Sequence, residues 1–175
     1  MADTGKILTA VGGILVIVAT FLLTWITDGG TIYYGLNFVM NLMGMFTDAG
    51  TWASNLGFSG MSFMAYIFAI LYILFILSGI FLLIGIKVRA LSIIGAIMPL
   101  VLGVFLLLFY TFGITLGPVG EDLFSPFGGS FQIVSGILPF GLTLDFLNLD
   151  LGALILLVGG VLGIVSGGFE RLSYY

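Results

Sequence analysis

The sequence predicts an all-α membrane protein, in which four helices cross the bilayer as a bundle and carry a small cap outside it. Of the 175 residues, 61% are hydrophobic and only 7% are charged. Soluble domains carry about 25% charged residues. Four apolar runs reach the length of a membrane span, and every basic residue lies at the end of one of them. We therefore expect a single integral membrane domain over residues 1–175.

The central hairpin is the clearest of these predictions. The runs 62–86 and 90–114 contain no charged residue, and only Lys87-Val88-Arg89 separates them. Each run exceeds the roughly 20 residues that a helix needs to cross a bilayer. Short loops rich in Lys and Arg remain cytoplasmic, so the closed end of the hairpin is expected to face the cytoplasm. Pro99 is expected to kink the second helix.

Two further spans are predicted over 7–26 and 151–169. The first run also has the basic start of a signal peptide. It is longer than an apolar signal region of about 7–15 residues, and no A-x-A cleavage site follows it. It is therefore interpreted as a retained helix. Trp25, near its end, is expected to anchor at the membrane interface.

The charge layout predicts the orientation. All bases fall at predicted cytoplasmic helix ends, and the segments 27–61 and 115–150 contain acids but no base. By the positive-inside rule, the chain lies in the cell membrane as a multi-pass protein with both termini in the cytoplasm, and the lipid bilayer is its first partner. The residues that set this topology are Lys6, Lys87, Arg89 and Arg171.

The two outer segments are expected to build the cap. Each has about 35 residues, whereas connections in helix bundles have roughly 2–8, and their apolar content argues against disorder. In the first, strand-favouring residues over 31–34 precede the helical spacing of Leu36, Val39, Met40 and Met43. A strand leading into a helix is our interpretation, with helices alone as the alternative. Residues 47–60, rich in Gly, Ser and Asn, predict a loop.

The second outer segment has two strand candidates. Residues 142–146 alternate apolar and polar side chains, and 132–134 form a shorter apolar stretch. Together the segments predict an outer interaction surface, because an exposed apolar cap favours a partner. Its residues are Tyr33, Tyr34, Leu36, Val39, Met40, Met43, Phe127 and Phe140.

Catalytic chemistry has little support in the residue inventory. The chain has no His and no Cys, and its four bases form no patch for nucleic acid. The acids and methionines allow three chemical hypotheses: a cation at Glu121-Asp122, acid–base catalysis by Asp145, and thioether ligation of a metal by the methionines. Solvated charge and apolar packing explain these residues better. We expect a protein that is not an enzyme, with no metal and no cofactor.

Gly159, Gly163 and Gly167 recur every four residues in the last predicted helix. This spacing lets another helix backbone approach closely. The neighbouring helix belongs either to the chain's own bundle or to a partner. Buried hydroxyls, such as those of Ser78 and Ser92, are expected to form structural hydrogen bonds between helices.

The functional prediction is a structural protein of membrane assemblies. It is an accessory subunit or self-assembling unit that contacts other membrane proteins, or copies of itself, through its outer segments and its Gly-rich fourth helix. The alternative is a passive channel, or a small-molecule or lipid conduit, formed by oligomerisation. A hydrophobic groove between Tyr72 and Tyr110 would favour a lipid-handling role.

The layout resembles the claudin and peripheral-myelin-protein class of tetraspan proteins. Trp25 and the pair Gly35-Leu36 stand where that class has its Trp and its Gly-Leu-Trp, whereas Asn37 replaces the second Trp and the two loop cysteines are missing. The resemblance implies four spans, cytoplasmic ends and an outer sheet built from both segments. The layout is equally similar to that of small four-span prokaryotic proteins.

Overall fold

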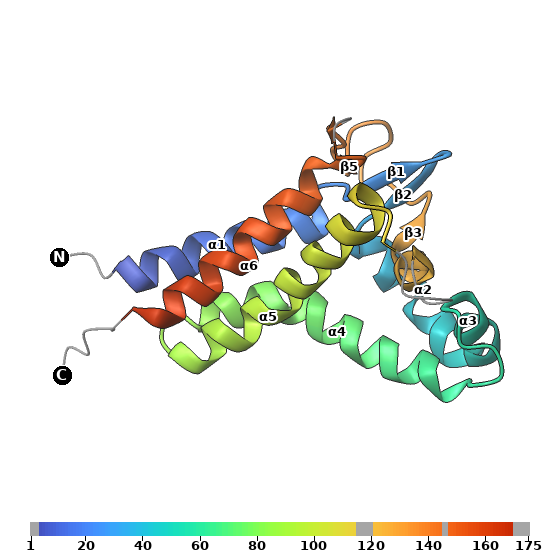
Figure 1. Ribbon diagram of the computed structural model, residues 1–175, viewed down its shortest axis with the longest axis horizontal. Coiled ribbons are helices and arrows are strands. Elements are labelled where there is room, and N and C mark those ends of the chain that lie inside the picture. The colour runs from blue at the N-terminus through green and yellow to red at the C-terminus, as the bar shows by residue number, and fades with distance from the viewer. Residues whose placement is uncertain (1–3, 115–120, 145–146, 170–175) are drawn as a thin grey trace.

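The computed structural model describes residues 4–114, 121–144 and 147–169, and it is mostly helical (Figure 1). Four helices are long and apolar enough to cross a membrane, which confirms that part of the prediction. They are α1 (Thr4–Phe21), α4 (Phe63–Ile84), α5 (Arg89–Leu106) and α6 (Leu151–Gly168). A π-helix, η1 (Leu107–Thr111), continues α5, which itself runs on through Pro99.

The first helix begins and ends earlier than the predicted range 7–26. After Phe21, the chain leaves the helix and pairs with a distant segment. The Phe140 amide donates to the Leu22 carbonyl at 2.8 Å, and the Thr24 amide donates to the Phe140 carbonyl at 3.1 Å. These bonds replace the helical ones, so an apolar run that reads as continuous helix ends about one turn before Trp25.

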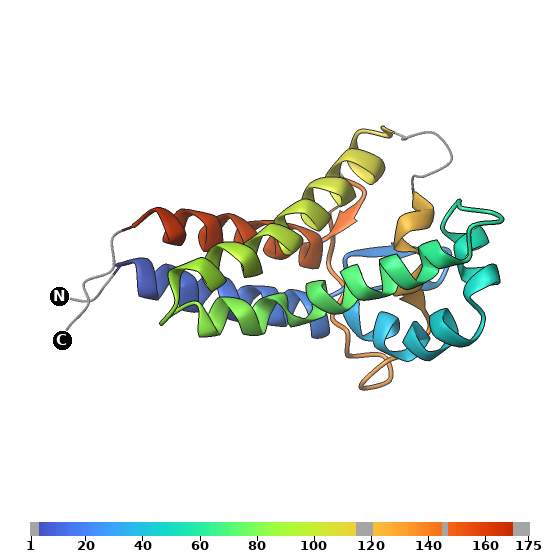
Figure 2. The same ribbon diagram turned by 90° about the horizontal axis from the view of Figure 1, so that it is seen from below.

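The four long helices form a closed ring in which α1 contacts α6 and α4, while α5 contacts α6 and α4 (Figure 2). Glycines in α6 make the close approaches. A Cβ atom at Gly159 would lie 2.7 Å from Val16 of α1, and one at Gly163 would lie 2.6 Å from Ala96 of α5. Gly167 faces Ile93 in the same way. The ladder therefore packs inside the chain's own bundle.

The bundle buries several hydroxyl groups beside its apolar core, and it also exposes many large apolar side chains. The buried Thr9 hydroxyl donates to Ser166 Oγ at 2.9 Å, and Ser166 Oγ lies 2.7 Å from the buried Ser92 Oγ. Large aliphatic side chains on the same helices are exposed, including Ile14 and Ile70. A water-soluble bundle differs on its outside, where charged and polar residues cover the face opposite its apolar stripe.

Both outer segments contribute to one cap at the end of the bundle away from the two termini (Figure 1). Strands β1 (Ile26–Asp28), β2 (Thr31–Tyr33) and β3 (Gly128–Gly129) form an antiparallel sheet in that order. The other cap elements are α2 (Gly35–Thr47), α3 (Ala49–Asn55), the 3-10 helix η2 (Glu121–Phe127) and the hairpin of β4 (Thr143–Leu144) and β5 (Leu149–Asp150).

The predicted strand leading into a helix is present as β2 and α2, but two other predictions for the cap are wrong. Residues 47–60 are not a loop throughout, because Ala49 and Ala53 of α3 bury themselves with Ala65 of α4, and this packing outweighs weak helix propensity. Residues 132–134 form no strand beyond a single bridge between Val134 and Leu138. Of 142–146, residues 143–144 are strand and 145–146 lie outside the described residues.

The α6 packing yields the first test. Replacing Gly163 with Leu forces a side chain into the space held by Ala96 and Leu82, and overpacking of this kind costs about 1–3 kcal/mol. We expect a lower midpoint of thermal unfolding in mild detergent. Gly168→Leu is the matched control, since no atom lies within 4 Å of a Cβ built there. Equal midpoints for the two variants would contradict the described packing.

Candidate functional site

An apolar groove lies between α4 and α5. The two helices diverge from their shared turn towards the cap (Figure 1), and η2 covers the groove at the cap end. Its volume is about 300 Å³. The lining is almost entirely apolar and comes from Phe68, Leu71, Tyr72, Phe75, Ile97, Met98, Val101, Leu102, Phe105, Leu123 and Phe124.

One hydrogen bond fixes the cover of this groove. The Tyr72 hydroxyl of α4 donates to the Leu123 carbonyl of η2 at 2.5 Å. Tyr72 therefore lines the groove, as the sequence-based hypothesis requires. Tyr110 does not line it: its ring centroid lies 6.0 Å from that of Phe124, and it faces a separate polar cavity of the cap.

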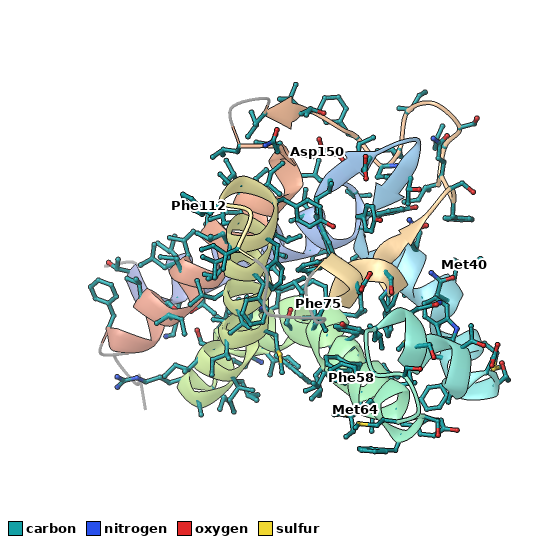
Figure 3. All side chains as sticks on the ribbon, turned by 45° about the vertical axis from the view of Figure 1, so that its right-hand side comes forward. Met40, Phe58, Met64, Phe75, Phe112 and Asp150 are labelled. Carbon is teal, nitrogen blue, oxygen red and sulfur yellow. The ribbon has the colours of Figure 1, made fainter. Side chains whose placement is uncertain are left out.

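Phe127, the last residue of η2, holds the cap onto the bundle. Its ring centroid lies 4.8 Å from that of Tyr72, 5.0 Å from that of Trp25 and 5.4 Å from that of Phe38. It also meets Phe75, labelled in Figure 3, at 5.8 Å. Buried aromatic pairs of this geometry contribute about 0.5–1.5 kcal/mol each beyond the area they bury. We call these five residues the aromatic cluster.

Three aromatic residues are therefore buried where we predicted exposure. The sequence predicts Phe127 and Tyr34 on the outer surface, yet both side chains are fully buried. The Tyr34 hydroxyl donates to the Phe131 carbonyl at 3.0 Å, and burial raises the pKa of its phenol. Trp25 is not an interfacial anchor, because its indole is buried and donates to the Ala19 carbonyl at 2.7 Å.

The rest of the predicted outer surface divides into two parts. Val39, Met40 and Met43 lie on one exposed face of α2, and Met43 keeps 73% of its surface accessible. Phe46 extends this face and stacks on Tyr66 of α4, with centroids 5.9 Å apart. We call Val39, Met40, Met43 and Phe46 the α2 stripe.

The other predicted surface residues lie apart from this stripe. Tyr33 and Leu36 are half-buried, and Phe140 is exposed beside the end of α1.

The described charges separate along the bundle. Lys6 lies near the start of α1, and Lys87 and Arg89 lie at the α4–α5 turn, all at the end away from the cap. The Arg89 side chain donates to the Gly167 carbonyl at the end of α6. The acids of the cap include Asp28, Asp48, Asp122 and Asp150. Arg171 and Asp145 lie outside the described residues.

Among the described residues, no group of three or more His, Cys, Asp or Glu side chains is placed to hold a metal ion. Glu121 and Asp122 begin η2, and the Asp122 side chain is exposed. Asp122 therefore has the setting of a solvated surface charge.

The fold and this geometry define the class as a protein with four helices of membrane-spanning character and a mixed helix–strand cap. No family model, curated protein or solved structure matches the chain. The resemblance to the claudin and peripheral-myelin-protein class stays a prediction.

The aromatic cluster gives a direct test of how the cap is attached. Phe127→Ala removes a fully buried ring, and such truncations cost about 3–5 kcal/mol. We expect loss of near-ultraviolet circular dichroism from the aromatic residues and faster proteolysis of the cap, while the helix signal stays. Phe140→Ala, which truncates an exposed ring in the same segment, is the control and should change neither.

Proposed function

We propose that this chain is a non-enzymatic, four-span protein of the cell membrane that serves as an assembly unit or accessory subunit of a larger membrane complex. The membrane assignment is supported by the distribution of side chains. The bundle encloses serine and threonine hydroxyls and glycines, and it exposes leucines, isoleucines and valines. In hydrocarbon, exposing such an apolar surface carries no free-energy penalty. Polar groups must instead form their hydrogen bonds inside the bundle.

The orientation we propose follows from the separated charges. The described bases lie at the end of the bundle that carries the α4–α5 turn, and the cap has only acids. The positive-inside rule then puts this turn and both termini in the cytoplasm and the cap outside. The cap is the part that meets partners beyond the bilayer surface.

The α2 stripe is the observation that carries the assembly role. Its side chains are exposed outside the four long helices, so the bundle does not account for their apolar character. The stripe meets the exposed start of α4 where Phe46 stacks on Tyr66. Exposed apolar surface of this kind marks interaction sites. The partner is another membrane protein or a second copy of the chain, and the ladder of Gly159, Gly163 and Gly167 in α6 packs within the chain's own bundle.

The stripe is tested by the double variant Met40→Gln with Met43→Gln. Burying one such side chain contributes about 1.5–3 kcal/mol, so losing both weakens association by roughly a hundredfold or more. Complex size in mild detergent, measured by light scattering with mass spectrometry of co-purified proteins, should fall to that of the lone chain. Ile133→Gln with Val134→Gln makes the same change at exposed cap positions off the stripe and should leave the complex intact.

The groove favours a second candidate, the binding of lipids or small hydrophobic molecules, which the conduit alternative also requires. It is apolar, and it lies between two helices of membrane-spanning length, where lipid chains would reach it. Apolar recesses with few polar groups are the usual sites for such ligands. Tyr72 is the main polar-tipped residue of the lining, and its hydroxyl is already bonded to Leu123.

A filled groove should no longer accept a lipid chain. Val101→Trp places an indole in the groove, and Val104→Trp places the same group on the exposed side of α5 without entering the lining. With a diazirine-labelled phosphatidylcholine in the membrane, groove peptides should lose crosslinking several-fold in the first variant only. Equal crosslinking in both variants would remove the lipid-binding candidate.

A further inference from the structure

A long loop of the cap, residues 130–142, exposes mostly apolar side chains. It connects β3 to β4, and the whole stretch from 123 to 144 contains no charged residue. Figure 2 shows this loop, in orange, beside the cap end of α1. Its large exposed apolar side chains are Phe131, Ile133, Val134, Ile137, Phe140 and Leu142. Loops that face water are normally polar, so this composition favours an apolar environment.

Backbone hydrogen bonds place the loop at the level where two of the long helices end. The Phe140 amide donates to the Leu22 carbonyl at 2.8 Å, and its carbonyl accepts from the Thr24 amide at 3.1 Å. These two partners directly follow α1. The Leu142 carbonyl accepts from the amide of Leu151, the first residue of α6, at 2.9 Å. The loop is therefore tied to the cap ends of α1 and α6.

The apolar surface of the loop also adjoins an exposed apolar face of α1. Val11, Ile14 and Leu22 are exposed, and their helical spacing puts them on one face. Leu22 keeps the register of that face, because its amide still donates to the Val18 carbonyl at 2.9 Å. Phe140, bonded to Leu22, begins where this face ends. In the topology that we propose, the same face of α1 meets lipid.

The tip of the loop provides partners for its own backbone amides. The Gly136 amide donates to Gln132 Oε1 at 2.7 Å. The amides of Ile137 and Leu138 donate to the Val134 carbonyl at 3.0 and 2.9 Å. A backbone amide that leaves water without a partner costs several kcal/mol. Because these amides are already bonded, the tip is suited to an apolar layer, and Ile137 keeps 64% of its surface accessible there.

We propose that the 130–142 loop inserts its apolar side chains into the outer leaflet of the bilayer, at the boundary between headgroups and acyl chains. This inference rests on the proposed four-span topology, which puts the cap ends of α1 and α6 at the outer membrane surface. Apolar faces of interfacial helices are buried about 5–10 Å into the same boundary. Because the loop has no base, its insertion does not require anionic lipid.

Insertion makes this loop an anchor at the outer interface. The indole of Trp25 does not serve this purpose, because it is buried in the cap. Interfacial anchors and packing between helices set the tilt and depth of a span. The loop would therefore fix how deeply α1 and α6, to which it is bonded, lie in the membrane.

The test measures the depth of the loop tip in phosphatidylcholine nanodiscs that hold the purified full-length protein. Ser135→Cys, at the exposed tip, is labelled with bimane. Lipids with a spin label on the acyl chain quench this fluorophore where it meets lipid. We expect quenching several-fold above that at Asp48→Cys, which is exposed on the cap outside the loop. Adding Ile133→Asp and Ile137→Asp should lower it to the Asp48→Cys level, because buried charge opposes insertion.

Ile14→Cys, exposed on α1, separates this inference from the four-span proposal, because its label should be quenched in any spanning bundle. Quenching at Ile14→Cys, with Ser135→Cys at the Asp48→Cys level, would overturn the loop inference and leave the spans standing. An unquenched Ile14→Cys would overturn both. If Ser135→Cys stayed quenched after the two Asp substitutions, the apolar side chains would not be what holds the loop in lipid, and the inference would be wrong.

Discussion

The ring of Phe127 is the contact on which the arrangement of this protein depends. It comes from the second outer segment and touches the end of the α1 region through Trp25, α2 through Phe38, and α4 through Tyr72 and Phe75. No other described residue joins so many separate parts of the chain in the aromatic cluster. The same short helix η2 places Leu123 and Phe124 over the groove. The same contacts of η2 therefore attach the cap and cover the groove. They are the buried aromatic packing and the Tyr72–Leu123 hydrogen bond.

The second constraint is the solvent that the bundle surface implies. Glycines allow the helix backbones to approach, and hydroxyls such as those of Thr9, Ser92 and Ser166 bond to one another. In the membrane setting that we propose, the exposed aliphatic side chains would face lipid. This arrangement explains why the α6 glycines lie on the inner face of the helix, where they pack against α1 and α5 of the same chain. A partner must then be sought on the cap, at the α2 stripe, or along the groove.

The sequence predicts the long helices well because their signal is local: uninterrupted apolar length and bases at the ends. The sequence-based prediction fails where contacts between distant segments determine the local structure or the burial of a side chain. Apolar residues after Phe21 leave the helix because they pair with Phe140, which composition does not reveal. Aromatic residues outside a span suit a surface or a core equally, so the sequence alone does not show that Tyr34 and Phe127 are buried. The burial of Asp150 depends on threonines at positions 24, 27 and 143, which only the fold brings together.

The central claim is that the α4–α5 turn and the cap lie in opposite compartments. The chain has no cysteine, so single cysteines can be introduced without background. Val88→Cys in the turn and Ser130→Cys in the cap, both at exposed positions, would be treated in intact cells with a membrane-impermeant maleimide. The account predicts labelling of Ser130→Cys at once and of Val88→Cys only after the membrane is opened. Labelling of both from the same side would contradict it.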